Sequence, residues 1–222
     1  MTGALKAYFE AVGAAVPENF TVAALTGRSG CGKSTVAAQF RAAGCPVLDA
    51  DKVAAAIMEE YPACVRELAE AFGEDILDEE GKLLRRKLAD RAFASPQGQT
   101  TLTGITHPYI IRSLLEKIQA EALRGAALVF VDGAVIVDEP FEVYCDKIVV
   151  VDAPEEQQVV RLCARDGITP EQARRRIGAQ LPRERLNAAA DAVICNDGAP
   201  EQLQLQAQTV LQNLQAGLRK NL

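Results

Sequence analysis

The chain has 222 residues and a formal net charge of −6, with 49% hydrophobic and 24% charged residues. This length and composition are typical of a globular α/β domain with a substantial buried core. The acidic balance and the absence of tryptophan argue against a general nucleic-acid-binding protein, because such proteins usually carry a basic face or a base-stacking aromatic surface.

The cysteines and the N-terminal segment bear on metal binding and cellular compartment. Six cysteines and one histidine are spread along the chain without a Cys-x-x-Cys pair, which disfavours a zinc site. Residues 1–17 lack the basic and apolar regions of a secretory signal peptide, and no run of about 18 apolar residues suggests a transmembrane helix. We therefore expect a cytoplasmic protein that binds no membrane and keeps all its thiols reduced.

The N-terminal third of the sequence alternates helical and extended patterns around a glycine-rich turn. We predict, in chain order, a helix over residues 5–15, a strand over 20–25, a turn over 26–34, a helix over 35–43 and a short strand over 46–48. Gly44 suits the end of the second helix, because glycine adopts the left-handed conformation that follows many helices at little cost. The short strand leads directly to Asp49 and Asp51.

Residues 53–125 contain no obvious strand and are predicted to form a helical insert. Apolar residues recur at spacings of three and four over residues 67–72, 86–93 and 108–122, which is the pattern of a helix with one buried face. Residues 78–81, with the sequence Asp-Glu-Glu-Gly, are predicted to form a turn. The pair His107-Pro108 is expected to begin the last of these helices, since proline fits the first turn of a helix.

The C-terminal half returns to an alternation of strands and helices. Continuous apolar runs predict strands over residues 127–131, 147–151 and 192–195, as expected for parallel strands covered on both faces. The first two of these strands lead to Asp132 and Asp152. Helices are predicted over residues 155–165, from 170 to about 180 after a capping box at 169–172, and over 201–219. The alternation predicts a parallel sheet with helices on both sides.

The turn after the first strand carries a complete phosphate-binding motif. Residues 27–34 read GRSGCGKS and match G-x-x-x-x-G-K-S, between a predicted strand and a predicted helix. The glycines let successive N–H groups point inward around phosphate oxygens, Lys33 reaches the β- and γ-phosphates, and Ser34 offers a hydroxyl to Mg²⁺. We predict that nucleotide is bound by Gly27, Gly30, Cys31, Gly32, Lys33, Ser34 and Thr35. Cys31 is interpreted as a filler whose thiol could react, because Lys33 and the helix N-terminus lie beside it.

The rest of the chain separates the classes of protein that share this loop. A GTPase would need a guanine-binding N-K-x-D motif, which is absent, and a motor or AAA-type ATPase would carry a strand that ends in paired acids. A small-molecule kinase needs an acid after the second strand and arginines that close over the phosphates. Asp49 and Asp51 lie at that position, and residues 161–185 contain seven arginines. The sequence therefore favours a small-molecule kinase.

An ordered series of motifs resembles that of the dephospho-CoA kinases. The matching positions are LTGRSGCGKST at 25–35, VLDAD at 47–51, Gly81, Leu83 and Arg85, His107-Pro108, the strand end at 149–152, Gln158, Arg161 and Arg165, and residues 190–198. The resemblance runs from about Phe20 to Gly198. The sequence departs from it within residues 132–138, where Ala134 and Asp138 stand in place of a proline and a glutamate, which leaves the acceptor contacts of that loop open.

The resemblance implies a P-loop kinase fold, which is a five-stranded parallel sheet flanked by helices, with a helical acceptor-binding insert and an arginine-rich lid. The chain would be a single kinase domain over residues 1–222, with the insert at 53–125 and the lid at 155–188. The implied reaction transfers the γ-phosphoryl group of ATP to the ribose 3′-hydroxyl of dephospho-CoA, with Mg²⁺ as the metal and CoA and ADP as products. The expected protein is a monomer or a small homo-oligomer.

The resemblance also implies roles for individual residues. Lys33, Asp51 and Arg165 would be catalytic, with Asp51 as the base or hydroxyl orienter and Arg165 as the lid arginine. The acceptor would contact Asp51, Arg85, His107 and Asp132, the metal would contact Ser34 and Asp49, and Asn196 and Gly198 would lie beside the adenine. Structural alternatives remain open, because an aspartate such as Asp51 often caps a helix and a lone histidine such as His107 is often structural.

Two other functions stay open at the level of sequence. One is another P-loop small-molecule kinase, of the nucleoside monophosphate or shikimate type. The other is a regulatory module in which ATP or GTP switches a partner surface. The regulatory module predicts stabilisation by nucleotide alone, whereas a kinase also responds to its acceptor.

Overall fold

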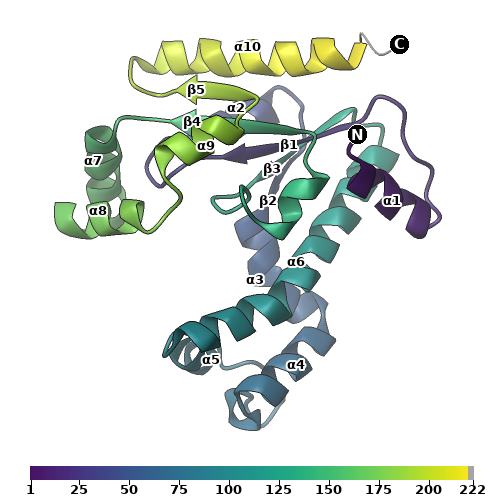
Figure 1. The fold of residues 1–222 in the computed structure, drawn as a ribbon, viewed down its shortest axis with the longest axis vertical. Helices are drawn as coiled ribbons and strands as arrows, with labels where there is room; N and C mark the ends of the chain where they lie inside the picture. The colour runs from purple at the N-terminus through teal and green to yellow at the C-terminus, as the bar shows by residue number, and fades with distance from the viewer. Residues whose placement is uncertain (220–222) are drawn as a thin grey trace. The chain divides into compact units, whose positions relative to one another are not determined.

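The computed structural model describes residues 1–219 and divides by internal contacts into two compact units (Figure 1). The sheet unit comprises Met1–Asp49 and Ile118–Leu222, and the helical unit comprises Ala50–Lys117. The motif DAD is therefore divided by this boundary, with Asp49 in the sheet unit and Asp51 in the helical unit.

The sheet unit is built on five parallel strands in the order β2-β3-β1-β4-β5. The strands are β1 (Thr21–Thr26), β2 (Val47–Asp49), β3 (Leu128–Asp132), β4 (Lys147–Asp152) and β5 (Ala192–Cys195). The predicted five-stranded parallel sheet is confirmed, with strand boundaries shifted by one residue at most. The central strands are almost wholly buried, which agrees with their continuous apolar sequences.

Helices cover the sheet and complete its core. They are α1 (Gly3–Ala11), α2 (Lys33–Ala42), α7 (Glu155–Asp166), α8 (Pro170–Gly178), α9 (Arg183–Ala189) and α10 (Pro200–Arg219), with a short 3₁₀ helix η2 (Pro140–Tyr144). Helix α10 packs against α2 and β5 (Figure 1). Inside this core the rings of Phe40 and Phe130 stack with centroids 4.2 Å apart, and burial of each such ring contributes about 2 kcal/mol.

Helix ends in the sheet unit are set by local capping residues, and the spacing of apolar residues alone predicts these ends only approximately. Helix α1 begins two residues before the predicted start, because the side chain of Thr2 caps it by accepting from the Leu5 N–H at 3.2 Å. It ends at Ala11 instead of residue 15, and Gly13 leaves the helical conformation with φ of +68°. The capping box that opens α8 is confirmed, and Gly44 takes the expected left-handed conformation with φ of +82°.

The helical unit consists of α3 (Ala50–Glu60), α4 (Pro62–Phe72), the 3₁₀ turn η1 (Glu74–Ile76), α5 (Arg85–Ala92) and most of α6 (Pro96–Leu123). The predicted turn at 78–81 is present, and the Asp78 carboxylate accepts from the N–H groups of Glu80 and Lys82. The prediction that His107-Pro108 begins a helix is wrong, because Pro108 lies inside α6. A proline removes one helical hydrogen bond, and the turns of this 28-residue helix continue on both sides of it.

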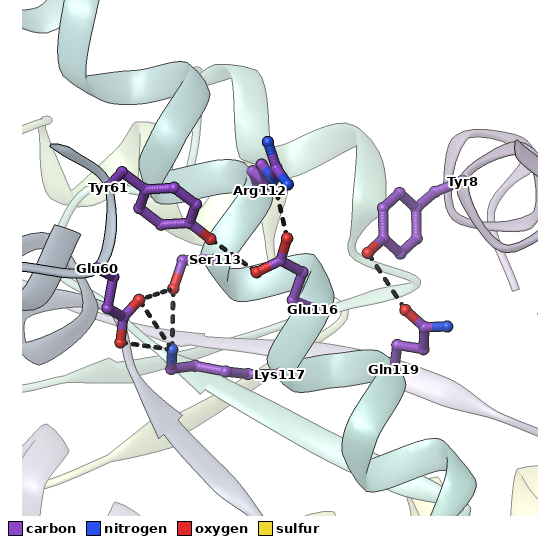
Figure 2. A network of polar contacts seen from close by, with 8 residues as sticks. All are labelled: Tyr8, Glu60, Tyr61, Arg112, Ser113, Glu116, Lys117 and Gln119. Atoms are coloured by element: carbon purple, nitrogen blue, oxygen red, sulfur yellow. Dashed lines mark hydrogen bonds and ion pairs between the residues drawn. The ribbon is translucent and has the colours of Figure 1, made fainter. Parts of the chain in front are cut away.

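A polar network joins the corner between α3 and α4 to helix α6 (Figure 2). The Tyr61 hydroxyl donates to Glu116 at 2.7 Å, and the buried Ser113 hydroxyl donates to Glu60 at 2.8 Å. Lys117 adds an ion pair with Glu60 at 3.0 Å. Burial, together with the neighbouring Glu116 carboxylate, raises the pKa of Tyr61 to about 12. These contacts hold the α3–α4 corner to α6 within the helical unit.

Neither a membrane-spanning helix nor a disulfide bond is present within residues 1–219. No helix within residues 1–219 is long and apolar enough to cross a membrane. All six cysteines are free thiols, which confirms that prediction.

Candidate active site

The phosphate loop lies between β1 and α2 and depends on glycine at three positions. Gly27, Gly30 and Gly32 have φ of +151°, +79° and +99°, a region that other residues rarely adopt. A Cβ atom on Gly27 would lie 2.3 Å from the carbonyl oxygen of Val151, and one on Gly30 would lie 2.7 Å from that of Gln158. The loop therefore packs so closely against β4 and α7 that side chains at these positions would displace it.

Two side chains from distant parts of the sequence hold the carbonyl groups of this loop. The Arg161 guanidinium, on α7, donates to the Gly30 carbonyl at 3.3 Å and to the Asn196 carbonyl at 3.2 Å. The Asn196 side chain donates to the Cys31 carbonyl at 2.8 Å, and a Cβ on Gly32 would collide with it. Asn196, expected beside the adenine, is thus a direct support of the loop in this structure.

Lys33 is the first residue of α2, and its ammonium group forms an ion pair with Asp132. Asp132 ends β3 and is buried, so it needs a cation or hydrogen bonds to offset its desolvation. Asp49, at the end of β2, lies beside Asp132 in the sheet register. The structure thus gathers Lys33, Asp49 and Asp132 at the carboxyl edge of the sheet, where open α/β folds bind their ligands.

The other strand-end acid, Asp152, is paired with an arginine that sequence reasoning did not single out. The Arg183 Nε donates to the Asp152 carboxylate at 2.7 Å, and this carboxylate raises the pKa of the arginine. Asp152 ends β4 and is only 5% exposed. The signal in the sequence was the aspartate itself, because a buried strand-end carboxylate requires a nearby cation.

Of the two arginines four positions apart on α7, it is Arg161 and not Arg165 that contacts the phosphate loop. Arg165 forms a two-pronged pair with Asp166, at 2.7 and 2.9 Å, and Arg176 donates to the same carboxylate at 2.8 Å. The Asp166 carboxylate raises the pKa of Arg165. Arg161, by contrast, points into the loop through the contacts described above.

The remaining loop residues differ in exposure. Ser34 and Thr35 are exposed in the first turn of α2, whereas Cys31 is buried. Burial raises the pKa of the Cys31 thiol to about 11, more than the nearby Lys33 lowers it. The expectation of a reactive Cys31 is therefore wrong, because the thiol stays protonated and inaccessible.

Three predicted site residues belong to the helical unit. Asp51 is exposed in the first turn of α3. Arg85 opens α5 and donates to the Ala55 carbonyl at 3.0 Å, with Glu59 nearby at 3.4 Å. His107 is half-buried within α6. These residues are presented by helices, while the phosphate loop and Gly198, which is exposed after β5, belong to the sheet unit.

The loop that departs from the resemblance, after β3, is tied to α9. Asp138 has φ of +65°, a left-handed conformation that aspartate tolerates better than most residues. Its carboxylate pairs with Arg185 of α9, with Nε at 3.0 Å. Val135 in the same loop is 67% exposed, and Ala134 is half-buried. Asp138 therefore anchors the loop to α9 in the sheet unit.

Oxygen donors suited to a divalent metal are present at the loop. Magnesium prefers oxygen ligands, and protein sites commonly offer it one or two carboxylates in addition to substrate phosphates. The Ser34 hydroxyl and the Asp49 carboxylate have this chemistry. Within residues 1–219 no group of three or more His, Cys, Asp or Glu side chains is arranged to hold a metal ion.

Comparisons with known proteins agree with one another. A family model described as dephospho-CoA kinase matches residues 21–202. Dephospho-CoA kinases of Anaeromyxobacter dehalogenans and Corynebacterium efficiens are 39% and 42% identical, over 90% and 84% of this chain and 95% and 94% of theirs. A crystal structure of a Thermus thermophilus protein matches with a TM-score of 0.73 at 35% identity, covering 88% of this chain and 98% of that one. The Campylobacter jejuni dephospho-CoA kinase structure matches with a TM-score of 0.61 at 26% identity, with the same coverage.

Proposed function

This chain belongs to the dephospho-CoA kinase family, and we propose that it transfers the γ-phosphoryl group of ATP to the ribose 3′-hydroxyl of dephospho-CoA. The observation that carries the proposal is the family match over residues 21–202, because this range includes both the phosphate loop and the helical unit. A chain that shared only the loop would match many nucleotide-binding families.

The phosphate loop supplies the nucleotide half of the reaction. Phosphoryl transfer asks mainly for positioning and for stabilisation of charge on the transferring group. Loop N–H groups other than those of Ser29 and Cys31, which donate to Gln180 and to the Arg28 carbonyl, would bind the phosphates. Lys33 would leave Asp132 to neutralise charge at the β- and γ-phosphates. Asn196 and Arg161 keep the loop in shape. Asn196 and Gly198, which follow β5, are also proposed to lie beside the adenine.

Asp51 is the proposed base. The acceptor O3′ forms a bond to the γ-phosphorus as the bond from that phosphorus to the oxygen of ADP breaks, and the hydroxyl proton passes to the Asp51 carboxylate. Ser34 and Asp49 would hold Mg²⁺, which supplies positive charge to the phosphates. Arg165 is the proposed lid arginine, and to act it must exchange Asp166 for phosphate.

The helical unit is the proposed acceptor-binding part, close in extent to the insert predicted at 53–125. Arg85 and His107 are proposed to contact dephospho-CoA there, with Asp132 contributing from the sheet unit. Residues 155–188, which contain the seven arginines of the lid region, are proposed to close over the phosphates. We propose that the enzyme works in the cytoplasm as a monomer or a small homo-oligomer.

A coupled assay of ADP release tests the function. Dephospho-CoA, AMP, shikimate and pantetheine are compared as acceptors, each with ATP and Mg²⁺. Of these four acceptors, we expect only dephospho-CoA to give turnover above the ATPase background. Turnover with AMP or shikimate but not with dephospho-CoA would reduce the assignment to another small-molecule kinase.

A second experiment tests the alternative that the protein is a regulatory module. In a thermal-shift experiment, a kinase should be stabilised further by acceptor in the presence of a non-hydrolysable ATP analogue. Stabilisation by nucleotide alone, with no turnover of any acceptor, would support the regulatory module instead.

A further inference from the structure

The connection between α8 and α9 contacts the phosphate loop through one side chain. The Ser29 N–H donates to the Gln180 side-chain oxygen at 2.8 Å, although the two residues lie 151 positions apart in the sequence. Both side chains are half-buried. Ser29 lies inside the G-x-x-x-x-G-K-S motif, and other N–H groups of this motif face phosphate. The contact therefore joins the predicted lid region to the nucleotide-binding backbone itself.

Gln180 is held in place from both sides. Before it, α8 ends at Gly178, and the buried Ile177 fixes that helix against α7. After it, Arg183 is anchored to the buried Asp152 at the end of β4. The short connection between these two anchors carries Gln180 over the loop. A residue whose flanking chain is anchored on both sides has less backbone freedom to lose, which favours precise positioning of a neighbour.

The chemistry of glutamine suits this position better than that of its acidic counterpart. An amide oxygen accepts the Ser29 N–H without bringing charge. A glutamate would accept the same N–H more strongly, because charge-assisted hydrogen bonds are stronger than neutral ones. It would also place a negative charge next to bound phosphates. If the hydrogen bond had a purely structural role, glutamate would serve as well as glutamine or better. A hydrogen bond beside ATP instead requires the neutral side chain.

We propose that Gln180 is a positioning residue for ATP, which fixes the Ser29 end of the phosphate loop from the lid side. This inference rests on the proposed function only in taking ATP as the nucleotide. It assigns Gln180 an effect on nucleotide binding, with no direct role toward the acceptor.

Direct binding of ATP to three variants tests the proposal. Gln180→Ala removes the hydrogen bond and is expected to weaken ATP binding roughly fivefold. Gln180→Asn keeps the amide but is one methylene too short, so it should behave like Gln180→Ala. Gln180→Glu keeps the hydrogen bond and adds charge, and is expected to weaken ATP binding on the order of tenfold or more. The measurement is the Kd of ATP by titration calorimetry, with the melting temperature of each variant alongside.

The order of the ATP affinities of the variants decides whether Gln180 positions the loop for ATP or has a purely structural role. The proposal requires ATP affinity to fall from wild type to Gln180→Ala to Gln180→Glu, while Gln180→Glu keeps the wild-type melting temperature. Gln212→Glu, which makes the same charge change at an exposed position of α10, is the matched control and should leave ATP binding unchanged. If Gln180→Glu bound ATP with wild-type affinity while Gln180→Ala bound it more weakly, the proposal would be overturned, and the hydrogen bond would have a purely structural role.

The same experiment separates this inference from the proposed function. ATP binding is measured without acceptor, so its outcome does not depend on dephospho-CoA. Turnover of dephospho-CoA by the wild-type enzyme tests the function by itself. In the variants, the KM for dephospho-CoA should stay within about twofold of wild type, and an acceptor KM that changed as much as the Kd of ATP would also count against the assigned role.

Discussion

In the sheet unit, polar side chains from distant parts of the sequence bind the backbone of the phosphate loop. In the helical unit, polar side chains of neighbouring helices bind one another instead. Arg161, Gln180 and Asn196 all contact the backbone of the phosphate loop. Glu60 and Tyr61, in contrast, pair with side chains of α6. The first arrangement fixes the shape of a binding site, while the second fixes the angle at which helices meet.

The carboxylates of the two units also differ in burial. Asp132 and Asp152 end strands, are 8% and 5% exposed, and each pairs with a cation beside the loop. In the helical unit Glu60 pairs with Lys117, and both side chains are more than a third exposed. A buried carboxylate that loses its partner is costly, while an exposed ion pair contributes little. Substitutions should therefore cost function and stability in the sheet unit, and mainly a modest amount of stability in the helical unit outside the proposed site residues Asp51, Arg85 and His107.

The largest effect is expected from Lys33→Ala. It removes the cation that stabilises charge on the transferring phosphoryl group, so kcat should fall on the order of 10³-fold or more. The measurement is ADP release at saturating ATP and dephospho-CoA. Lys82→Ala, which removes an exposed lysine of the helical unit, is the control and should retain activity. Because Asp132 loses its partner as well, the melting temperature must be measured to separate a loss of chemistry from a loss of fold.

Asp51→Asn tests whether the helical unit contributes to the chemistry. The substitution keeps the shape of the side chain but removes the proton acceptor, so kcat should fall on the order of 10²-fold while the Kd of ATP stays unchanged. The comparison between units would need revision if kcat remained near normal. In that case Asp49, which belongs to the sheet unit, becomes the better candidate for the base.

The parts of the fold that were predictable are those with a local cause. The strand β1, the phosphate loop and the start of α2 follow from one motif and its flanking apolar residues. Strands β3 and β4 follow from continuous apolar runs. Helix ends were less predictable, since the start of α6 at Pro96 was hidden by Pro108, a residue that the helix accommodates in its interior.

The site was predictable in its residue types but not in its contacts. Arg161 and Arg165 lie four positions apart on α7, and the pattern of the sequence could not decide which one contacts the loop. The pairs Gln180–Ser29 and Arg183–Asp152 join residues 151 and 31 positions apart, and such contacts depend on how the chain folds back. Cys31 was misjudged because the sequence shows its neighbours but not its burial.

Two arginines of α9 give a matched test of burial within the sheet unit. Arg183→Met leaves Asp152 buried without its cation and should lower the free energy of unfolding by about 3 kcal/mol. Arg185→Met removes the partner of Asp138, which is 43% exposed, and should cost much less. Urea unfolding at neutral pH measures both. Equal losses would mean that burial of the acid does not set the energy of these pairs.

The smallest expected effect lies in the helical unit and depends on pH. Tyr61→Phe removes the hydrogen bond to Glu116 and should lower the free energy of unfolding by about 1 kcal/mol at pH 8. The pKa of Tyr61 is raised from an ordinary value of about 10 to about 12, so the folded protein holds this proton more tightly than the unfolded chain. The stabilisation is therefore complete below pH ~10 and is lost as the pH rises toward 12.

Urea unfolding at pH 8 and at pH 10.5 checks the sign of this pH dependence. The difference between wild type and Tyr61→Phe should narrow at pH 10.5, because the unfolded wild-type tyrosine begins to ionise there. Thr106→Val is the control, since it removes a buried, neutral hydrogen bond of helix α6, from the Thr106 hydroxyl to the Leu102 carbonyl, and no group that titrates in this range. Its deficit should be the same at both pH values. A deficit of Tyr61→Phe that is equally constant would show that the tyrosine proton is not held by the network, and that its contact with Glu116 contributes no pH-dependent stability to the α3–α4 corner.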